Sequence, residues 1–109
     1  MQLNEYQEQA NKTALYPGRG TNILYPTLGL CGESGEVAEK VKKLIRDRDG
    51  KMDDAWKAEL TKELGDVLWY ISQLAFELGT DLEHVANMNI EKLHSRMERK
   101  TLHGDGDNR

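Results

Sequence analysis

Apolar residues recur at intervals of three and four along most of the chain, a spacing that predicts amphipathic helices. The longest such pattern starts at Asp53 or Asp54 and ends at Gly79, and we expect it to form the central helix of the core. Its apolar positions are Trp56, Leu60, Leu64, Val67, Leu68, Ile71, Leu74, Ala75 and Leu78. No alternation of apolar and polar residues is long enough to predict a strand. The pattern therefore predicts an all-α fold.

A second long helix is predicted from about Pro26 to the stop at Asp49–Gly50. Its apolar stripe consists of Leu30, Val37, Val41, Leu44 and Ile45. Three glycines also fall within it, at Gly29, Gly32 and Gly35. Glycine is unfavourable in a helix interior. These positions therefore indicate either a close backbone approach to a neighbour or ligand, or a non-helical start before Glu33.

Two shorter helices complete the prediction. The first is weakly apolar and begins near Asn4, which resembles a capping box together with Gln7. The last opens at Thr80, which forms a second capping box with Glu83. The chain is thus expected to contain four helical segments.

Length and composition limit the class of protein. The 109 residues suit one domain, residues 1–100, followed by a Gly- and Asp-rich tail, residues 101–109, that we expect to lack regular structure when free. With 15 basic and 19 acidic residues, the net charge of −4 disfavours nucleic acid as a partner. No apolar run is long enough for a membrane span. The single cysteine, Cys31, is expected in the core, and together these features predict a cytoplasmic protein.

Two pairs of acidic residues lie beside the apolar stripes of the two long helices. Glu33 and Glu36 are three residues apart, as are Glu63 and Asp66, so each pair projects from one side of its helix. If the stripes pack together, four like charges converge at a half-buried boundary and require a cation. Oxygen ligands suit Mg²⁺ or Mn²⁺ rather than zinc. The alternative is a solvated face with ion pairs such as Glu36–Lys40, but the matched positions on two helices favour a metal site.

Other candidate residues follow the acidic pairs. Asn89 falls at a position that the apolar stripe of the last helix would bury, where an amide needs partners. It either crosslinks helices or binds a polar ligand together with Lys92 and Arg96, whose charges would neutralise phosphate. Tyr70 and Trp69 are candidates for stacking on a base, although core packing is the more common role for Trp69.

The acidic pairs lie within sequence runs that resemble a known family. In GLCGESGEVAEKVKK and KELGDVLWYISQLA they read E-x-x-E and then E-x-x-D. From Tyr25 to Arg99, the chain resembles the MazG-like, all-α nucleoside triphosphate pyrophosphohydrolases, relatives of the dimeric dUTPases and the dCTP pyrophosphatases. The resemblance implies a bundle-like fold of four to five helices. It also implies a homodimer or homotetramer, in which a neighbouring chain can complete the active site.

The resemblance also implies a reaction. Glu33, Glu36, Glu63 and Asp66 would hold Mg²⁺ ions, with Mn²⁺ as the alternative, and Glu33 or Glu36 would act as general base. The substrate would be a nucleoside triphosphate, hydrolysed between its α- and β-phosphates to a monophosphate and pyrophosphate. Divalent ions that clamp phosphates and acidify a bound water suit this chemistry.

The substrate contacts implied by the resemblance lie further along the chain. Tyr70 matches an aromatic position near the nucleotide, and Asn89, Lys92 and Arg96 resemble the helix that contacts it. Arg109 would reach a phosphate if the tail folds over the nucleotide; otherwise the tail stays disordered. Our hypothesis is a Mg²⁺-dependent pyrophosphohydrolase for nucleotide-pool sanitation or remodelling. The alternative is a non-enzymatic helical interaction module that uses its acidic helix edges.

Overall fold

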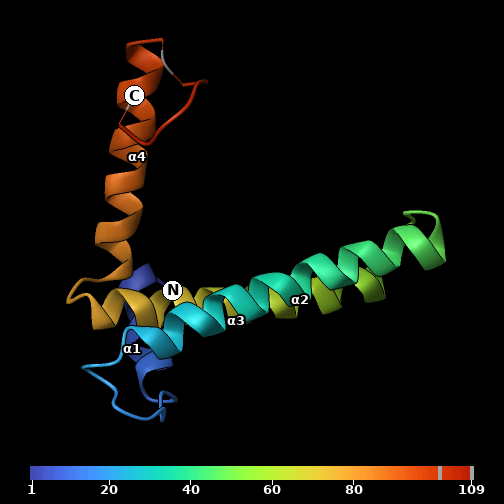
Figure 1. The fold of residues 1–109 in the computed structure, drawn as a ribbon, viewed down its shortest axis with the longest axis horizontal. Coiled ribbons are helices and arrows are strands. Elements are labelled where there is room, and N and C mark those ends of the chain that lie inside the picture. The colour runs from blue at the N-terminus through green and yellow to red at the C-terminus, as the bar shows by residue number, and fades with distance from the viewer. Residues whose placement is uncertain (101, 109) are drawn as a thin grey trace.

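Residues 1–100 and 102–108 are described by a computed structural model, and within these ranges all of the regular secondary structure is helical (Figure 1). The helices are α1 (Leu3–Asn11), α2 (Leu24–Arg48), α3 (Asp54–Glu77) and α4 (Leu82–Glu98). This confirms the all-α class. In the described part of the chain, no helix is both long enough and apolar enough to cross a membrane.

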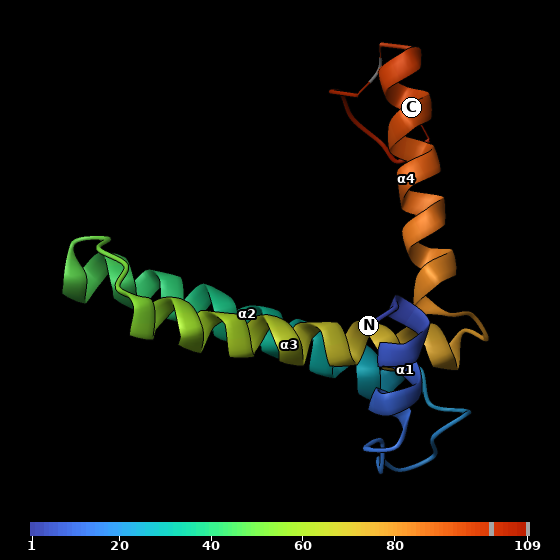
Figure 2. The same cartoon turned by 180° about the vertical axis from the view of Figure 1, so that it is seen from behind.

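The two long helices form an antiparallel hairpin, and they lie side by side in front and back views (Figures 1 and 2). α2 ends at Arg48 and is capped by Asp49, whose φ of 52° is left-handed, and the Gly50 amide donates to the Leu44 carbonyl at 3.1 Å. Asp53 then caps α3, its side chain accepting from the Trp56 amide at 2.7 Å. The predicted stop and restart between the long helices are therefore confirmed.

The predicted capping boxes of the two shorter helices are wrong. α1 is capped by Gln2, with Glu5 as the reciprocal partner, and α4 is capped by Asp81 rather than Thr80. The Asp81 side chain accepts from the amide of His84 at 2.8 Å. The real cap of α1 lies two residues before the predicted one, and the real cap of α4 lies one residue after it, which is the usual scatter of sequence patterns at helix ends.

The residues predicted to cap α1 instead hold the start of α4. The side-chain oxygen of Gln7 accepts from the Leu82 amide at 3.0 Å, and that of Asn4 accepts from the Glu83 amide at 3.1 Å. Gln7 is buried and also donates to the Ser72 carbonyl of α3 at 3.2 Å. The first amides of a helix have no partner within the helix. α1 therefore supplies these partners and fixes where α4 leaves the body.

The segment between α1 and α2 is anchored to the end of α3 by Glu77. This carboxylate accepts from the Tyr16 hydroxyl at 2.6 Å, the Gly20 amide at 2.9 Å and the Asn22 amide at 3.3 Å. Burial, followed by the hydrogen bond to Glu77, raises the pKa of Tyr16 to about 12. The same hydrogen bond lowers the pKa of Glu77. This anchor fixes the buried ring of Tyr16 beneath the start of α2.

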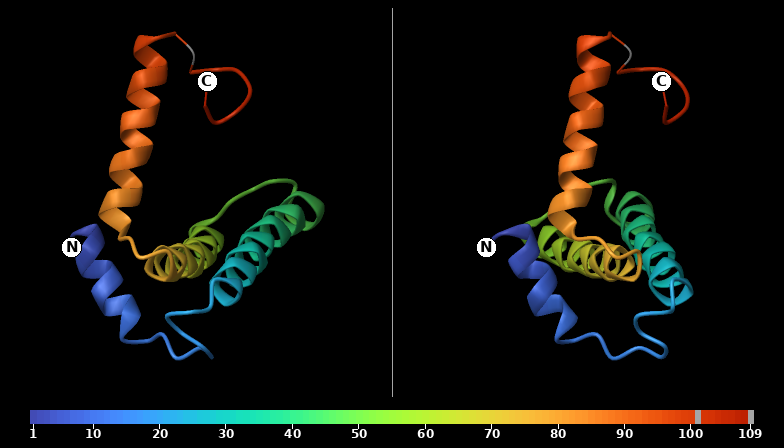
Figure 3. Two further views of the ribbon diagram at one scale, coloured as in Figure 1. Left: turned by 60° about the vertical axis from the view of Figure 1, so that its left-hand side comes forward. Right: turned by 90° about the vertical axis from the view of Figure 1, so that its left-hand side faces the viewer.

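α4 extends away from the hairpin after its first turns (Figure 3). It contacts α1 and α3, but within the described residues it does not pack against α2. The radius of gyration is 16.8 Å, whereas a compact chain of this length has about 13 Å. The helices of a single chain therefore do not close into a compact bundle.

Several residues predicted to lie in the core are exposed in the single chain. Leu64 is 54% exposed, Leu78 62% and Ile45 65%, and Cys31 is exposed as well. α4 presents further apolar side chains, namely Val85, Met88, Ile90 and Met97. The prediction of a core position for Cys31 is wrong for the isolated chain, because no helix in the described part of the chain covers that side of α2.

Candidate functional site

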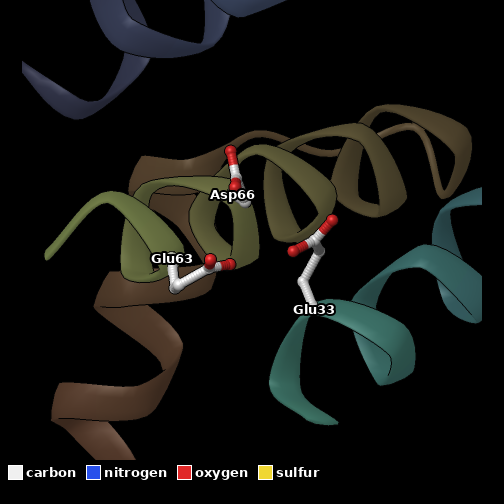
Figure 4. A group of neighbouring side chains, drawn as sticks. All are labelled: Glu33, Glu63 and Asp66. Atoms are coloured by element: carbon white, nitrogen blue, oxygen red, sulfur yellow. The ribbon is translucent and has the colours of Figure 1, made fainter. Parts of the chain in front are cut away.

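Three acidic side chains converge where α2 and α3 face one another (Figure 4). Glu33 reaches across from α2, while Glu63 and Asp66 project from α3. One carboxylate oxygen from each residue lies within 4.8 Å of the other two. The hairpin thus brings one residue of the first predicted pair and both residues of the second into one acidic cluster, a name we keep for Glu33, Glu63 and Asp66.

The acidic cluster carries more negative charge than the neighbouring cations neutralise. Glu33 and Glu63 are half-buried and Asp66 is exposed. Burial, followed by repulsion from Asp66 and Glu63, raises the pKa of Glu33. One cation approaches, with the Lys40 ammonium 3.8 Å from a Glu63 oxygen. Three carboxylate donors with this excess charge suit a hard divalent cation such as Mg²⁺ or Mn²⁺.

Glu36, the fourth acidic residue of the predicted set, lies apart from the other three. Its side chain is exposed, and it is not among the acidic groups that meet within 4.8 Å in the described part of the chain. Its charge still contributes to the raised pKa of Glu33. Glu36 therefore borders the acidic cluster without joining it.

A cavity of about 320 Å³ adjoins the acidic cluster. It is lined by Thr13, Glu33, Asp66, Trp69 and Tyr70. The indole nitrogen of Trp69 donates to the Thr13 hydroxyl at 2.8 Å, which fixes the edge of the indole ring. Thr13 was not predicted from the sequence, because it lies in an irregular segment and carries no motif. The cavity combines an aromatic wall with the acidic edge.

Tyr70 is held in place by its neighbours on both sides. Its ring centroid is 5.0 Å from that of Trp69, nearly perpendicular to it, and 6.4 Å from that of Tyr25. Tyr25 stacks in turn on Tyr16 at 4.7 Å. This row of rings leads from the Glu77 anchor to the cavity beside the acidic cluster.

The first glycine of α2 explains how Tyr70 fits against the hairpin. A Cβ on Gly29 would lie 2.1 Å from Cε1 of Tyr70, so only glycine leaves room for the ring. The close-approach alternative is therefore confirmed at Gly29. A Cβ on Gly32 or Gly35 would meet nothing within 4 Å among the described residues. α2 is helical through all three positions, so the non-helical start before Glu33 is wrong.

The predicted substrate-binding residues of α4 form a separate group. Asn89 is exposed, so the prediction of a buried amide is wrong, because α4 leaves the body of the chain. Lys92 and Arg96 both contact Asp107 of the tail, and with Asn89 they line a cavity of about 600 Å³. They lie in the second half of α4, which stands away from the hairpin (Figures 1 and 3). A single chain therefore does not bring them to the acidic cluster, and Arg109 lies outside the described residues.

Comparisons with known proteins point to one family. The profile described as MazG nucleotide pyrophosphohydrolase domain matches residues 24–100, from the start of α2 to just beyond α4. The Gene 37 protein of Mycobacterium phage L5 is 46% identical over 114 residues, and the alignment covers 100% of both chains. The Uncharacterized protein YvdC of Bacillus subtilis strain 168 is 38% identical over 74 residues, 63% of this chain and 70% of that protein. No solved structure matched the chain.

Proposed function

Because the chain belongs to the MazG nucleotide pyrophosphohydrolase domain family, we propose that it hydrolyses nucleoside or deoxynucleoside triphosphates to monophosphate and pyrophosphate. The reaction would depend on Mg²⁺, with Mn²⁺ as the alternative, and would serve nucleotide-pool sanitation or remodelling. The observation that carries the proposal is the meeting of Glu33, Glu63 and Asp66 within 4.8 Å, beside a cavity with an aromatic wall.

The residues of the hairpin suit distinct parts of this reaction. Glu33, Glu63 and Asp66 would hold a divalent ion, which supplies charge stabilisation to phosphate oxygens and acidifies a bound water. Glu33 meets the other two acids and lines the cavity, whereas Glu36 does neither, so Glu33 is the better placed of the first pair to act as general base. Tyr70 and Trp69 offer an aromatic surface of the kind on which a base stacks.

We place the complete site in a homodimer or homotetramer. The cations of α4 would neutralise substrate phosphates, yet they stand apart from the acidic cluster in one chain. Exposed apolar residues on α2, α3 and α4 and the extended shape favour association with a second copy. A partner chain could therefore bring its Asn89, Lys92 and Arg96 to the acidic cluster of the first.

Subunit mixing tests this arrangement. A Glu63→Gln chain and an Arg96→Gln chain are each expected to be nearly inactive. If the two residues act across an interface, refolding them together regenerates one intact site per mixed dimer, or about a quarter of wild-type activity after random pairing. Light scattering gives the oligomeric state in the same samples. An active monomer, or a mixture with no recovered activity, would contradict the shared site.

The reaction itself is tested with a panel of canonical and damaged nucleoside and deoxynucleoside triphosphates in the presence of Mg²⁺ or Mn²⁺. Phosphorus NMR resolves the products, and monophosphate with pyrophosphate is expected for at least one substrate. Diphosphate with inorganic phosphate would contradict the proposed cleavage position. Failure of metal plus nucleotide to give either product or a thermal shift would favour the interaction module instead.

A further inference from the structure

The C-terminal tail folds back onto α4 through Asp107. The Lys92 ammonium lies 2.7 Å from one carboxylate oxygen of Asp107, and the Arg96 guanidinium lies 3.3 Å from the same oxygen. Arg96 also donates to the backbone carbonyl of Asp107. Only 5% of Arg96 is exposed, whereas the Asp107 side chain is 76% exposed. The tail therefore covers the Arg96 side chain and itself faces the solvent.

Lys92 and Arg96 form a pair suited to an oxyanion. They are four residues apart, so they project from the same face of α4 and converge on one carboxylate. A phosphate oxygen makes the same charge-assisted hydrogen bonds to an ammonium and a guanidinium as a carboxylate oxygen does. The Lys92 hydrogen bond, followed by that of Arg96, lowers the pKa of Asp107, so this carboxylate is ionised at neutral pH.

The space around this contact is large enough for more than a carboxylate. The cavity of about 600 Å³ lies between α4 and the tail and includes Asn89 and Ser95 beside the two cations. Its wall also includes Val85 and Met88 at the end nearer the body. The site thus offers hydrogen-bonding groups and room beyond the place that Asp107 occupies.

We propose that Lys92 and Arg96 form an anion site for the phosphates of the substrate, and that Asp107 is its internal competitor. The Asp107 carboxylate occupies the place of a phosphate oxygen, and the substrate displaces the tail in order to reach both cations. This inference rests on the proposed function for the identity of the substrate. It gives the tail a role opposite to that of a lid: the tail weakens substrate binding instead of holding the substrate in.

The binding step is tested with tripolyphosphate in the presence of EDTA, which removes any contribution of a metal at the acidic cluster. Titration calorimetry on the full-length protein at low salt compares wild type with Asp107→Asn. Because the Asp107 carboxylate is largely exposed, its ion pairs have modest free energies, and we expect the substitution to tighten binding by roughly two- to fivefold. Lys92→Gln and Arg96→Gln are expected to weaken it, and high salt should shrink all these differences.

Asp105→Asn is the matched control, because it removes the same charge from the same exposed tail without touching the two cations. No ion pair of Asp105 occurs within the described residues. Equal binding by the Asp105→Asn and Asp107→Asn variants would overturn the proposal, as would tripolyphosphate binding that is independent of Lys92 and Arg96 or absent from wild type. Weaker binding by Asp107→Asn would support a lid instead.

Kinetics separate this inference from the proposed function. On the best triphosphate of the panel, Asp107→Asn is expected to lower KM by the same two- to fivefold and to leave kcat nearly unchanged. If no triphosphate is hydrolysed, the proposed function fails while the tripolyphosphate titration still decides whether Asp107 competes. If hydrolysis is normal and the Asp107→Asn variant has the wild-type KM, the inference alone fails.

Discussion

The acidic cluster and the cation pair of α4 are held in place by different means. The acidic cluster sits on two long packed helices, beside a row of aromatic rings that fits against a glycine. Its like charges repel one another, and Lys40 at 3.8 Å is a distant counter-ion. Lys92 and Arg96 instead lie on a helix that stands away from the body, and the chain itself supplies their counter-ion, Asp107.

This difference indicates what each region needs from a ligand. The acidic cluster carries uncompensated charge, so a bound cation would relieve repulsion that folding has already imposed. The cation pair already has a carboxylate partner in Asp107, so an incoming anion that is to contact both cations has to replace it. We therefore expect shape-changing substitutions to act most strongly on the hairpin and changes in ionic strength to act most strongly on α4.

The largest expected effect is on catalysis at the acidic cluster. Glu63→Gln keeps the size of the side chain but removes a charge at the centre of the proposed metal site, and we expect it to lower kcat/KM by about 100-fold or more. The measurement is the initial rate of pyrophosphate release at several Mg²⁺ concentrations. The matched control is Glu59→Gln, one turn earlier on α3, where an exposed carboxylate pairs with Lys62 at 3.3 Å. Equal rates for Glu63→Gln and wild type would exclude Glu63 as a metal ligand.

A second prediction concerns the packing beneath the cavity. Gly29→Ala would place a methyl carbon 2.1 Å from Cε1 of Tyr70, a severe clash. Because Trp69 and Tyr25 flank that ring and limit its movement, we expect the folded protein to be destabilised by about 1–3 kcal/mol. Gly32→Ala is the matched control in the same helix, where the added methyl group meets no described atom. It should stabilise the helix by about 0.5–1 kcal/mol.

Denaturant unfolding of the two glycine variants at equal protein concentration measures the difference. Near-UV circular dichroism reports in addition on the aromatic row, which Gly29→Ala should perturb and Gly32→Ala should not. If both substitutions stabilise the protein, Tyr70 can move freely and the hairpin is less tightly packed there than the structure shows. If both destabilise it, a second copy of the chain covers Gly32, which sharpens the case for an interface on that face of α2.

The sequence predicts the hairpin well because local rules determine it. Apolar spacing and the Asp49–Gly50 stop each act within a few residues, and the structure confirms the two long helices, the stop and a restart at Asp54. The same spacing placed the acidic pairs on facing sides of two helices, and the structure brings Glu33, Glu63 and Asp66 together.

Long-range contacts account for what the sequence did not predict. Asn4 and Gln7 resemble a capping box, yet they bond to amides of α4 more than 70 residues away. Thr13 carries no motif, and only folding places it against Trp69. The exposure of Asn89 follows from the direction in which α4 leaves the body, and no periodicity within α4 encodes that direction.

The smallest expected effect concerns the stability of the metal-free protein, and it has opposite signs in the two regions. Burial and acidic neighbours raise the pKa of Glu33 above 4.5, its ordinary value in the unfolded chain. Between pH 4.5 and the raised pKa, the folded chain therefore holds more protons than the unfolded chain. Stability from this group is therefore lost as pH rises through the raised pKa. The pKa of Asp107 lies below 3.8 because of Lys92 and Arg96, so its contribution is present above 3.8 and lost as pH falls through the lowered value.

Melting temperatures measured in EDTA separate the contributions of Glu33 and Asp107. The measurements run from pH 3 to pH 7, roughly the range over which carboxyl groups titrate. Glu33→Gln should raise the melting temperature at neutral pH by a few degrees, because it removes repulsion, while the added stabilisation by Mg²⁺ should shrink. Asp107→Asn should lower the melting temperature slightly at neutral pH and leave the Mg²⁺ response intact. If Glu33→Gln destabilises the metal-free protein, the acidic cluster is already compensated by a charge such as that of Lys40. The acidic cluster and the cation pair of α4 would then both have a counter-ion within the chain, and only the identity of that counter-ion would differ.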